Sequence, residues 1–279
     1  KIMKKILLMV MLTTMAFSQY TDGNTVVTWS KYKWEPIGEN PDLSWDDRGV
    51  DVAAYHSARN PVSRQLMSSM ILTHFWTGES EDVAILGEFR NLEAATDYAG
   101  FNNIDDMAWR NPDERATAVS NYNRHFQSYH EDVHILEHWK ALEKKNTMAL
   151  TGEETINNGN VVSVSVRYWK RLSDVEDGSS ADRLNMMKKY ANEVVKKNPK
   201  IVSQKVLTHL WSGSIEGGSL PVFYITEYAS LEDMAEAGNG ALEDAAFGDN
   251  RWGYWKYFHN IWDKHSDLGI FKTFGPANK

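Results

Sequence analysis

The chain has 279 residues, of which 42% are hydrophobic and 12% aromatic, enough to bury the core of a folded protein. Its formal net charge is −8, without the basic stripe of a protein that tracks phosphates, so we expect no nucleic-acid partner. It has no cysteine, which excludes a disulfide framework and the lipidated cysteine of a bacterial lipoprotein.

The N-terminal segment predicts export. Lys4 and Lys5 precede an apolar run at 6–15 and then Ala16-Phe17-Ser18, the pattern of a secretory signal peptide, so we assign residues 1–18 to one. No later run approaches the roughly 20 apolar residues that a membrane-spanning helix needs. We therefore expect a protein without a membrane span, located in the periplasm or secreted.

Two segments of nearly the same sequence lie 135 positions apart. Residues 72–78 read LTHFWTG and residues 207–213 read LTHLWSG. Two β-rich runs, Thr25 to Trp34 and Asn160 to Trp169, match at the same offset. We therefore predict a tandem duplication. Its parts are a first repeat over residues 25–146, a polar linker over 147–160 and a second repeat over 161–279.

Each repeat predicts the same order of elements: strand, helix, strand, strand, helix, strand. The strands are expected at 25–34, 72–78, 83–89 and 133–136, and again at 160–169, 207–213, 222–228 and 268–274. The helices are expected at 52–58, 91–95 and 112–129, and again at 180–198, 230–234 and 251–264, with Asn91, Ser180 and Ser230 as N-caps. This order is that of a ferredoxin-like α+β unit, in which helices cover one face of an antiparallel sheet.

The open faces of two such sheets would cover each other. In this order of elements, and in the segment Tyr228 to Asp233 where the third strand meets the second helix, the chain resembles the dimeric α+β barrel superfamily. That superfamily includes antibiotic-biosynthesis-type monooxygenases and stress-responsive barrel proteins. The resemblance covers residues 25–140 and 160–274, and it implies a pseudo-dimeric α+β barrel. The superfamily contains cofactor-free oxygenases, haem-binding enzymes and proteins with no known chemistry, so the resemblance is compatible with oxygenation of an aromatic substrate and with a bound haem. No family motif of catalytic residues carries over.

Alternation along the first strands predicts a pocket inside the barrel. Val162, Val164 and Val166 share one face, which we expect to meet the helices. The opposite face carries Ser163, Ser165, Arg167 and Trp169, and in the first repeat Thr28, Ser30, Tyr32 and Trp34. A polar and aromatic interior is typical of a ligand site. The expected ligand contacts are Arg167, Tyr32 and Ser165, with Trp34, Trp169, Trp76 and Trp211 as the walls.

A histidine and a glutamate are expected to face each other in each repeat. If the hairpins are centred on positions 81 and 218, His74 lies opposite Glu88 and His209 lies opposite Glu227. A carboxylate neighbour favours the charged imidazole and fixes its orientation, as a general base or a ligand-binding cation requires. The same pairs could instead fix the hairpin register.

A zinc site is an alternative. Residues 130–134 spell H-E-x-x-H, and on a helix His130, His134 and His138 would share one face, with Glu131 polarising a water molecule. The matching segment of the second repeat keeps only His265 and aligns with a strand. On a strand His130 and His134 would lie about 13 Å apart, too far for one metal ion. The strand interpretation is preferred, and it leaves no metal site.

The sequence thus predicts an exported protein that binds a small organic molecule in a polar, aromatic barrel pocket. Monooxygenase activity is what the family resemblance adds. A zinc-dependent hydrolase and a non-catalytic interaction module are the alternatives, and whether the chain is an enzyme stays open.

Overall fold

The computed structural model describes residues 23–38, 43–77, 82–97, 103–130, 134–146, 159–170, 174, 180–210, 220–248 and 261–274. The predicted signal peptide, Glu131, Trp211 and most of the predicted linker lie outside these ranges. Within them, no helix has the length and apolarity needed to cross a membrane.

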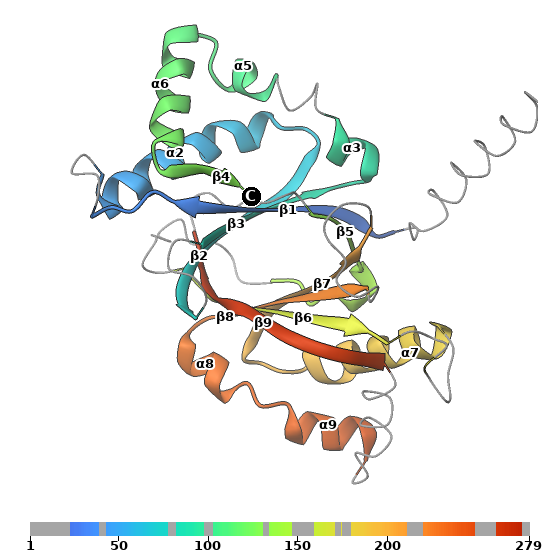
Figure 1. Cartoon of the computed structure of the whole chain (residues 1–279). Coiled ribbons are helices and arrows are strands. Elements are labelled where there is room, and N and C mark those ends of the chain that lie inside the picture. The colour runs from blue at the N-terminus through green and yellow to red at the C-terminus, as the bar shows by residue number, and fades with distance from the viewer. Residues whose placement is uncertain are drawn as a thin grey trace, which may run out of the picture.

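In the described part of the chain, eight antiparallel strands close into a barrel (Figure 1). In ring order they are β3 (Asp82–Phe89), β2 (Leu66–Thr77), β9 (Trp262–Thr273), β6 (Val161–Trp169), β8 (Pro221–Tyr228), β7 (Ile201–His209), β5 (His134–His138) and β1 (Thr25–Trp34), which pairs again with β3. A further strand, β4 (Phe126–His130), pairs with the far end of β1. Every barrel strand therefore has two neighbours, which removes the free sheet edges.

The N-terminal half (residues 23–146) and the C-terminal half (residues 159–274) each supply four neighbouring strands of the barrel. They join at two seams. At one seam β2 pairs with β9, where His74 lies opposite Phe271. At the other β5 pairs with β7, where Leu136 lies opposite His209. Closure thus depends on both halves.

Helices lie on two opposite outer sides of the barrel (Figure 1). The N-terminal half supplies α2 (Trp45–Val62), α3 (Leu92–Thr96), α5 (Ile104–Ala108), α6 (Pro112–Asn123) and the short 3₁₀ helix η1 (Lys140–Leu142). The C-terminal half supplies α7 (Ser180–Tyr190), its π-helical continuation η3 (Ala191–Val195), α8 (Leu231–Glu236) and α9 (Gly240–Phe247). Two predicted caps are confirmed: Asn91 accepts a hydrogen bond from the Ala94 amide at 2.9 Å, and Ser230 one from the Asp233 amide at 3.0 Å.

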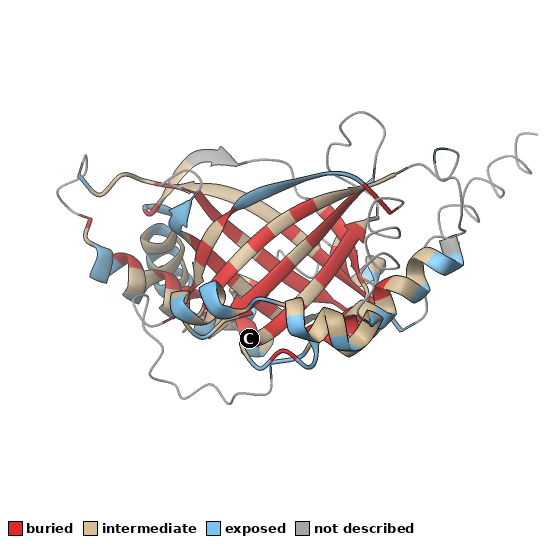
Figure 2. Cartoon of the chain, turned by 90° about the horizontal axis from the view of Figure 1, so that it is seen from below, coloured by how far each residue is buried: buried red, intermediate tan, exposed pale blue. Residues whose placement is uncertain are grey.

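The barrel interior is apolar, so the predicted orientation of the first strands was wrong. Val162, Val164 and Val166 point inward and pack with Val27 and Trp29 across the barrel. Figure 2 shows the buried residues following the barrel strands. The reason is physical: two sheets that close on each other leave no solvent between them, and the most apolar faces gain most from burial there. The polar faces consequently point toward the helices.

Two predicted helices end differently in the structure. Helix α6 ends at Asn123, and residues 126–130 form β4 where helix was expected, because Phe126 pairs with Trp34 of β1. Residues 262–264 belong to β9, whereas 251–260 lie outside the described residues. Helix α2 begins earlier than predicted, at Trp45, and holds Pro61 in its last turn. Pairing with distant strands decided the first two cases.

Candidate functional site

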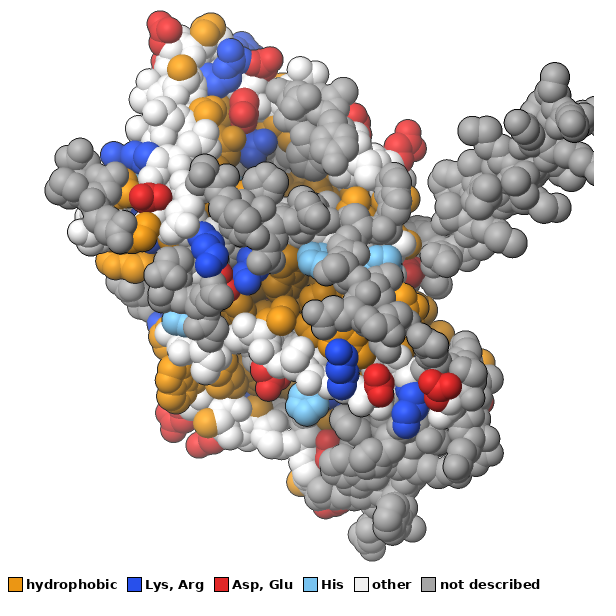
Figure 3. Space-filling view, in the orientation of Figure 1, with side chains coloured by type: hydrophobic (Ala, Val, Ile, Leu, Met, Phe, Trp, Pro, Cys, Tyr) orange, Lys and Arg blue, Asp and Glu red, His pale blue; other side chains and the backbone are white. Residues whose placement is uncertain are grey.

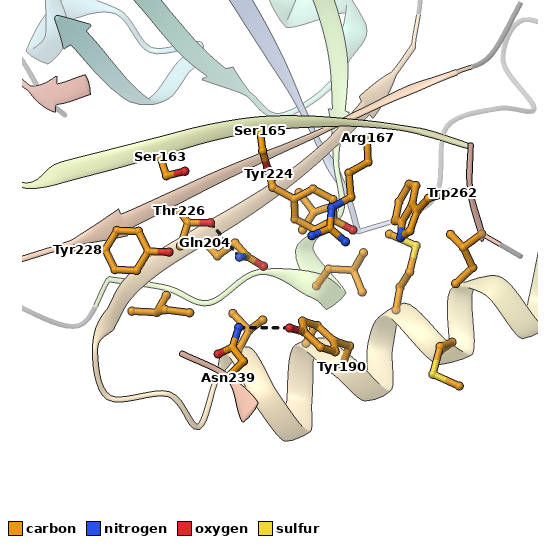
Figure 4. Close-up of a pocket in the computed structure, with 18 residues that line it drawn as sticks. Ser163, Ser165, Arg167, Tyr190, Gln204, Tyr224, Thr226, Tyr228, Asn239 and Trp262 are labelled. Atoms are coloured by element: carbon orange, nitrogen blue, oxygen red, sulfur yellow. Dashed lines mark hydrogen bonds between the residues drawn. The ribbon is translucent and has the colours of Figure 1, made fainter. Parts of the chain in front are cut away.

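A pocket of about 200 Å³ lies between the outer face of the C-terminal strands and the α7–η3 helix (Figure 4). Its polar lining comes from β6, β7 and β8: Ser163, Ser165, Arg167, Gln204, Tyr224 and Tyr228. Ala191 and Val195 of the π-helical segment line the opposite wall. A π-helical turn is rare and frequently marks a functional site.

Arg167 dominates the charge of this pocket. Its guanidinium carbon lies 5.1 Å from the ring centroid of Tyr224 and 5.7 Å from that of Trp262. Both distances are within cation–π range. In Figure 4 the guanidinium points into the cavity. A planar guanidinium offers paired N–H donors that match a carboxylate, so this side chain is suited to an anionic ligand group.

The helix side of the pocket carries a hydrogen-bonded tyrosine. The Tyr190 hydroxyl donates to Glu243 Oε1 at 2.9 Å and accepts from Asn239 Nδ2 at 3.2 Å. Across the cavity, Gln204 Nε2 donates to Thr226 Oγ1 at 2.9 Å. These contacts fix the polar groups in place. The pocket therefore has a cationic side and a neutral, hydrogen-bonding side.

The same outer side of the N-terminal half is filled by aromatic rings. Trp34 stacks on Phe126 with centroids 4.7 Å apart, and Tyr32 meets Phe126 edge to face at 5.7 Å. The Trp34 indole N–H donates to Thr73 Oγ1 at 3.0 Å. This cluster packs against Val52 of α2. Tyr32 and Trp34, expected as pocket residues, therefore belong to a helix-covered core.

The other predicted contacts divide. Ser165 and Arg167 do line a pocket, although it lies outside the barrel. Trp169 packs in the apolar cluster beside that pocket, with the Arg183 guanidinium 5.4 Å from its ring, and does not line the cavity. Trp76 is 63% exposed and lines none of the described pockets. Trp211 lies outside the described residues.

A second charged site lies at one mouth of the barrel, centred on the buried Glu88. Its carboxylate oxygens accept from five side chains: Thr25 at 2.6 Å, Ser68 at 2.9 Å, His138 at 3.1 Å, Lys140 at 3.1 Å and Lys205 at 2.7 Å. Lys140 also contacts Glu143 at 2.8 Å. A pocket of about 470 Å³ opens here. The site joins strands of both halves.

The electrostatics of this cluster favour an ionised glutamate beside a neutral imidazole. Burial alone would raise the pKa of Glu88, but the hydrogen bond with His138 and the charge of Lys205 hold that pKa well below its usual range. Burial lowers the pKa of His138. We infer that neutral His138 donates through Nδ1 to Glu88.

Neither predicted histidine–glutamate pair forms. Glu88 lies opposite Ser68, and Glu227 lies opposite Ser203. Each serine precedes the expected histidine of its strand by six residues, which is roughly 20 Å along an extended strand. In both hairpins the centre lies about three residues earlier in the chain than the sequence analysis assumed. The pair that exists, His138 with Glu88, has one sequence signal: Glu88 alternates with Ala84 and Leu86, which marks it as inward-facing.

The helix that the zinc alternative requires does not form in the described part of the segment. His130 lies in β4, and His134 and His138 lie in β5, so the H-E-x-x-H segment is strand wherever it is described. His134 faces Phe223 edge to face at 5.9 Å, while His138 holds Glu88 at the mouth. Among the described residues, no group of histidines and acids gathers that could hold a metal ion.

No protein-family model matches the sequence, and no curated protein matches it either. Solved structures do resemble the fold. A candidate monooxygenase from Fusobacterium nucleatum subsp. nucleatum aligns with a TM-score of 0.53 and 8% identity, covering 91% of this chain and 94% of that one. A candidate monooxygenase from Lactobacillus acidophilus NCFM aligns with a TM-score of 0.51 and 11% identity, covering 90% and 94%. The chain is thus an α+β protein with a closed eight-stranded antiparallel barrel of the monooxygenase-like fold.

Proposed function

We propose that this chain is an exported protein that binds a small aromatic anion in the pocket beneath α7 and η3. The observation that carries the proposal is Arg167, whose guanidinium points into the helix-side pocket of the C-terminal half. The equivalent space in the N-terminal half is filled by aromatic rings. The guanidinium is half-buried beside two aromatic rings and presents planar N–H donors, so this side of the pocket suits an anionic group on the ligand.

The size of the pocket favours a single ring. An engineered cavity of about 150 Å³ binds benzene, so a volume of about 200 Å³ suits a ring with one or two substituents. Tyr224 and Trp262 flank Arg167, and the Tyr190 hydroxyl lies on the helix side. The expected pose places an acidic group on Arg167 and a hydroxyl near Tyr190.

Oxygenation of such a ring is the activity that the family resemblance favours. Haem is also compatible with that resemblance, but the described pocket does not fit it. Tyrosine and methionine, which can ligate haem iron, are both present in the described lining, so the size of the pocket decides the fit. A porphyrin is several times larger than the benzene that fills about 150 Å³, and this pocket has a volume of about 200 Å³. We therefore assign no haem to this pocket.

We also propose that the two halves arose by duplication, as two ferredoxin-like units in one chain. Three matched features support this. Both halves arrange their strands so that the first lies between the last and the third. Asn91 and Ser230 cap matching helices, and Ser68–Glu88 matches Ser203–Glu227. A duplication makes the two helix-side spaces equivalent in origin, and in this chain one is filled by aromatic rings while the other keeps a pocket.

Isothermal titration with 4-hydroxybenzoate tests the binding proposal. We expect the wild type to bind it, and Arg167→Ala to bind it roughly 10-fold to 100-fold more weakly, because charge-assisted hydrogen bonds are lost. Arg183→Ala is the matched control, since Arg183 stacks on Trp169 outside the cavity. Equal binding by both variants would contradict the proposal.

An oxygen electrode then separates binding from catalysis. Oxygen uptake that depends on the aromatic compound and on Arg167 would support a monooxygenase. Binding without uptake would leave a binding protein. If neither 4-hydroxybenzoate nor benzoate bound, the non-catalytic interaction module would be the better description of the chain.

A further inference from the structure

We propose a second ligand site, separate from the helix-side pocket: the mouth of the barrel binds a small primary amine, whose ammonium group pairs with Glu227. The site is the pocket of about 470 Å³ whose lining includes both Glu227 and the Glu88 cluster. It lies inside the barrel, whereas the Arg167 pocket lies outside the sheet, so either site could exist without the other.

Glu227 is a buried carboxylate without a described counter-ion. It is 6% exposed and accepts only from neutral groups, Ser203 Oγ at 2.6 Å and Asn160 Nδ2 at 2.7 Å. Among the residues that the structure describes, no lysine, arginine or histidine lies within ion-pair distance of it. A buried charge is costly unless it is paired, so an uncompensated carboxylate that lines a cavity favours a cationic occupant.

The charges at this mouth show which carboxylate is left over. Lys205 bonds to Glu88 at 2.7 Å, and Lys140 bonds to both Glu88 and Glu143 at 3.1 and 2.8 Å. Two ammonium groups thus compensate two carboxylates. Glu227 is the third acid of the pocket lining, and neither of these two ammonium groups contacts it.

The difference between the two glutamates has a simple origin in the strands beside them. Each accepts a hydrogen bond from a serine of the neighbouring strand, Ser68 for Glu88 and Ser203 for Glu227. Lys205 of β7 reaches across the barrel to Glu88, but its counterpart in β2, 135 positions earlier, is Met70. A methionine cannot make the reciprocal ion pair with Glu227.

The lining also indicates the class of amine. A carboxylate has about four acceptor positions, and the serine and asparagine use two, so an ammonium group can take the rest. Val27, Met70 and Leu86 supply an apolar surface for a hydrocarbon body. Lys144 and Lys145 line the same pocket and oppose any cation that does not contact Glu227 directly, which makes each further positive charge on the ligand more costly. A monoamine with an apolar body fits better than a polyamine.

Titration of the full chain with benzylamine, and with benzyl alcohol as its uncharged counterpart, tests the proposal. We expect one benzylamine to bind per chain and the alcohol to bind roughly 10-fold to 100-fold more weakly, because it lacks the charge-assisted hydrogen bond. Glu227→Gln should weaken benzylamine binding by about the same factor. Glu232→Gln, which removes an exposed charge, should leave it unchanged.

A steric variant locates the site without disturbing the buried carboxylate. Met67 lines the pocket and is 49% exposed, so Met67→Trp should block the mouth without affecting folding. Met107→Trp is the control, because Met107 is 47% exposed and lines no described pocket. Equal affinity for amine and alcohol would overturn the proposal, as would full benzylamine affinity in Glu227→Gln or in Met67→Trp. If Glu227→Gln does not fold, the two tryptophan variants decide.

Discussion

Replacing Glu88 by glutamine tests whether charge holds the mouth of the barrel together. Glutamine keeps the shape of the side chain, but it leaves Lys205 with Glu143 at 4.0 Å as its nearest acid, whereas Lys140 keeps Glu143 at 2.8 Å. Breaking a buried ion pair from one side costs about 3–5 kcal/mol. Because the two lysine side chains are 18% and 27% exposed, we expect a smaller loss of unfolding free energy, about 2–3 kcal/mol at pH 7.

The pH dependence of this loss is the sharper test. Although burial opposes it, the contacts with His138 and Lys205 depress the pKa of folded Glu88 below the value of 4.5 for a free glutamate. A depressed pKa means that Glu88 stabilises the fold above pH 4.5 and that this contribution is lost as the pH falls. At pH 3.5 the wild type should therefore have lost about 1.4 kcal/mol that Glu88→Gln does not lose.

Urea unfolding at pH 7.0, 4.5 and 3.5 measures both effects. Glu193→Gln serves as the control, because Glu193 pairs with Lys197 on an exposed helix surface and should behave as the wild type does. The free-energy difference between wild type and Glu88→Gln should shrink from pH 4.5 to 3.5. A difference that stays constant over that range would show that folded and unfolded Glu88 have the same pKa, and the reasoning would fail.

Three further changes test other parts of the fold. Leu207→Ala should lower the unfolding free energy in urea by about 2–5 kcal/mol, because Leu207 is fully buried in the barrel interior. Gly269 has φ of +148°, and an added Cβ would lie 2.6 Å from the Thr77 carbonyl oxygen, so Gly269→Ala should lower the unfolding free energy by about 1–3 kcal/mol. Gly238→Ala is the control, because a Cβ there meets no atom within 4 Å, and its melting temperature should be close to that of the wild type. Burial lowers the pKa of His56 to about 4, so its ring resonances should not titrate above pH 5, and a midpoint near 6.5 would contradict the packing.

Local signals in the sequence were enough to indicate the eight barrel strands and several helices, but not β4, α5 or α9. The alternation from Thr25 to Trp34 predicted β1 with its observed bounds, and Asn91 and Ser230 marked helix starts through their own capping bonds. These features depend on residues a few positions apart. The order of elements follows from them, and it favoured the α+β barrel architecture that the strand pairing has.

The pairing register of the hairpin strands, and the strand face that points into the barrel, could not be found in the same way. Both depend on contacts between residues that are distant in the sequence. The hairpin centre was assumed, and an error of three residues moves Glu88 from His74 to Ser68. The strand face was assigned by supposing that helices cover the valines. In a closed barrel the enclosed face is the drier one, so Val162, Val164 and Val166 lie inside.

The charged cluster at the barrel mouth was also beyond local reasoning. His138 lies 50 positions from Glu88, and Lys205 lies 117 positions from it. Only the closure of both halves brings these side chains together. The alternation of Glu88 with Leu86 places its carboxylate inside, and an inward-facing acid needs donors, but the sequence does not indicate which ones.

One difference between matched positions accounts for the contrast between the two helical layers. At the position of Tyr32 in β1, β6 carries Arg167. A tyrosine ring packs against Phe126 and completes an apolar layer under α2, which excludes water. A charged guanidinium does not complete an apolar layer in that way, and at Arg167 the space beneath the helix stays open as a pocket. Figure 3 shows hydrophobic side chains gathered in the middle of this face, with charged side chains beside them and on the outer parts of the molecule. Arg167→Tyr should therefore close the helix-side pocket, raise stability and abolish binding of 4-hydroxybenzoate together.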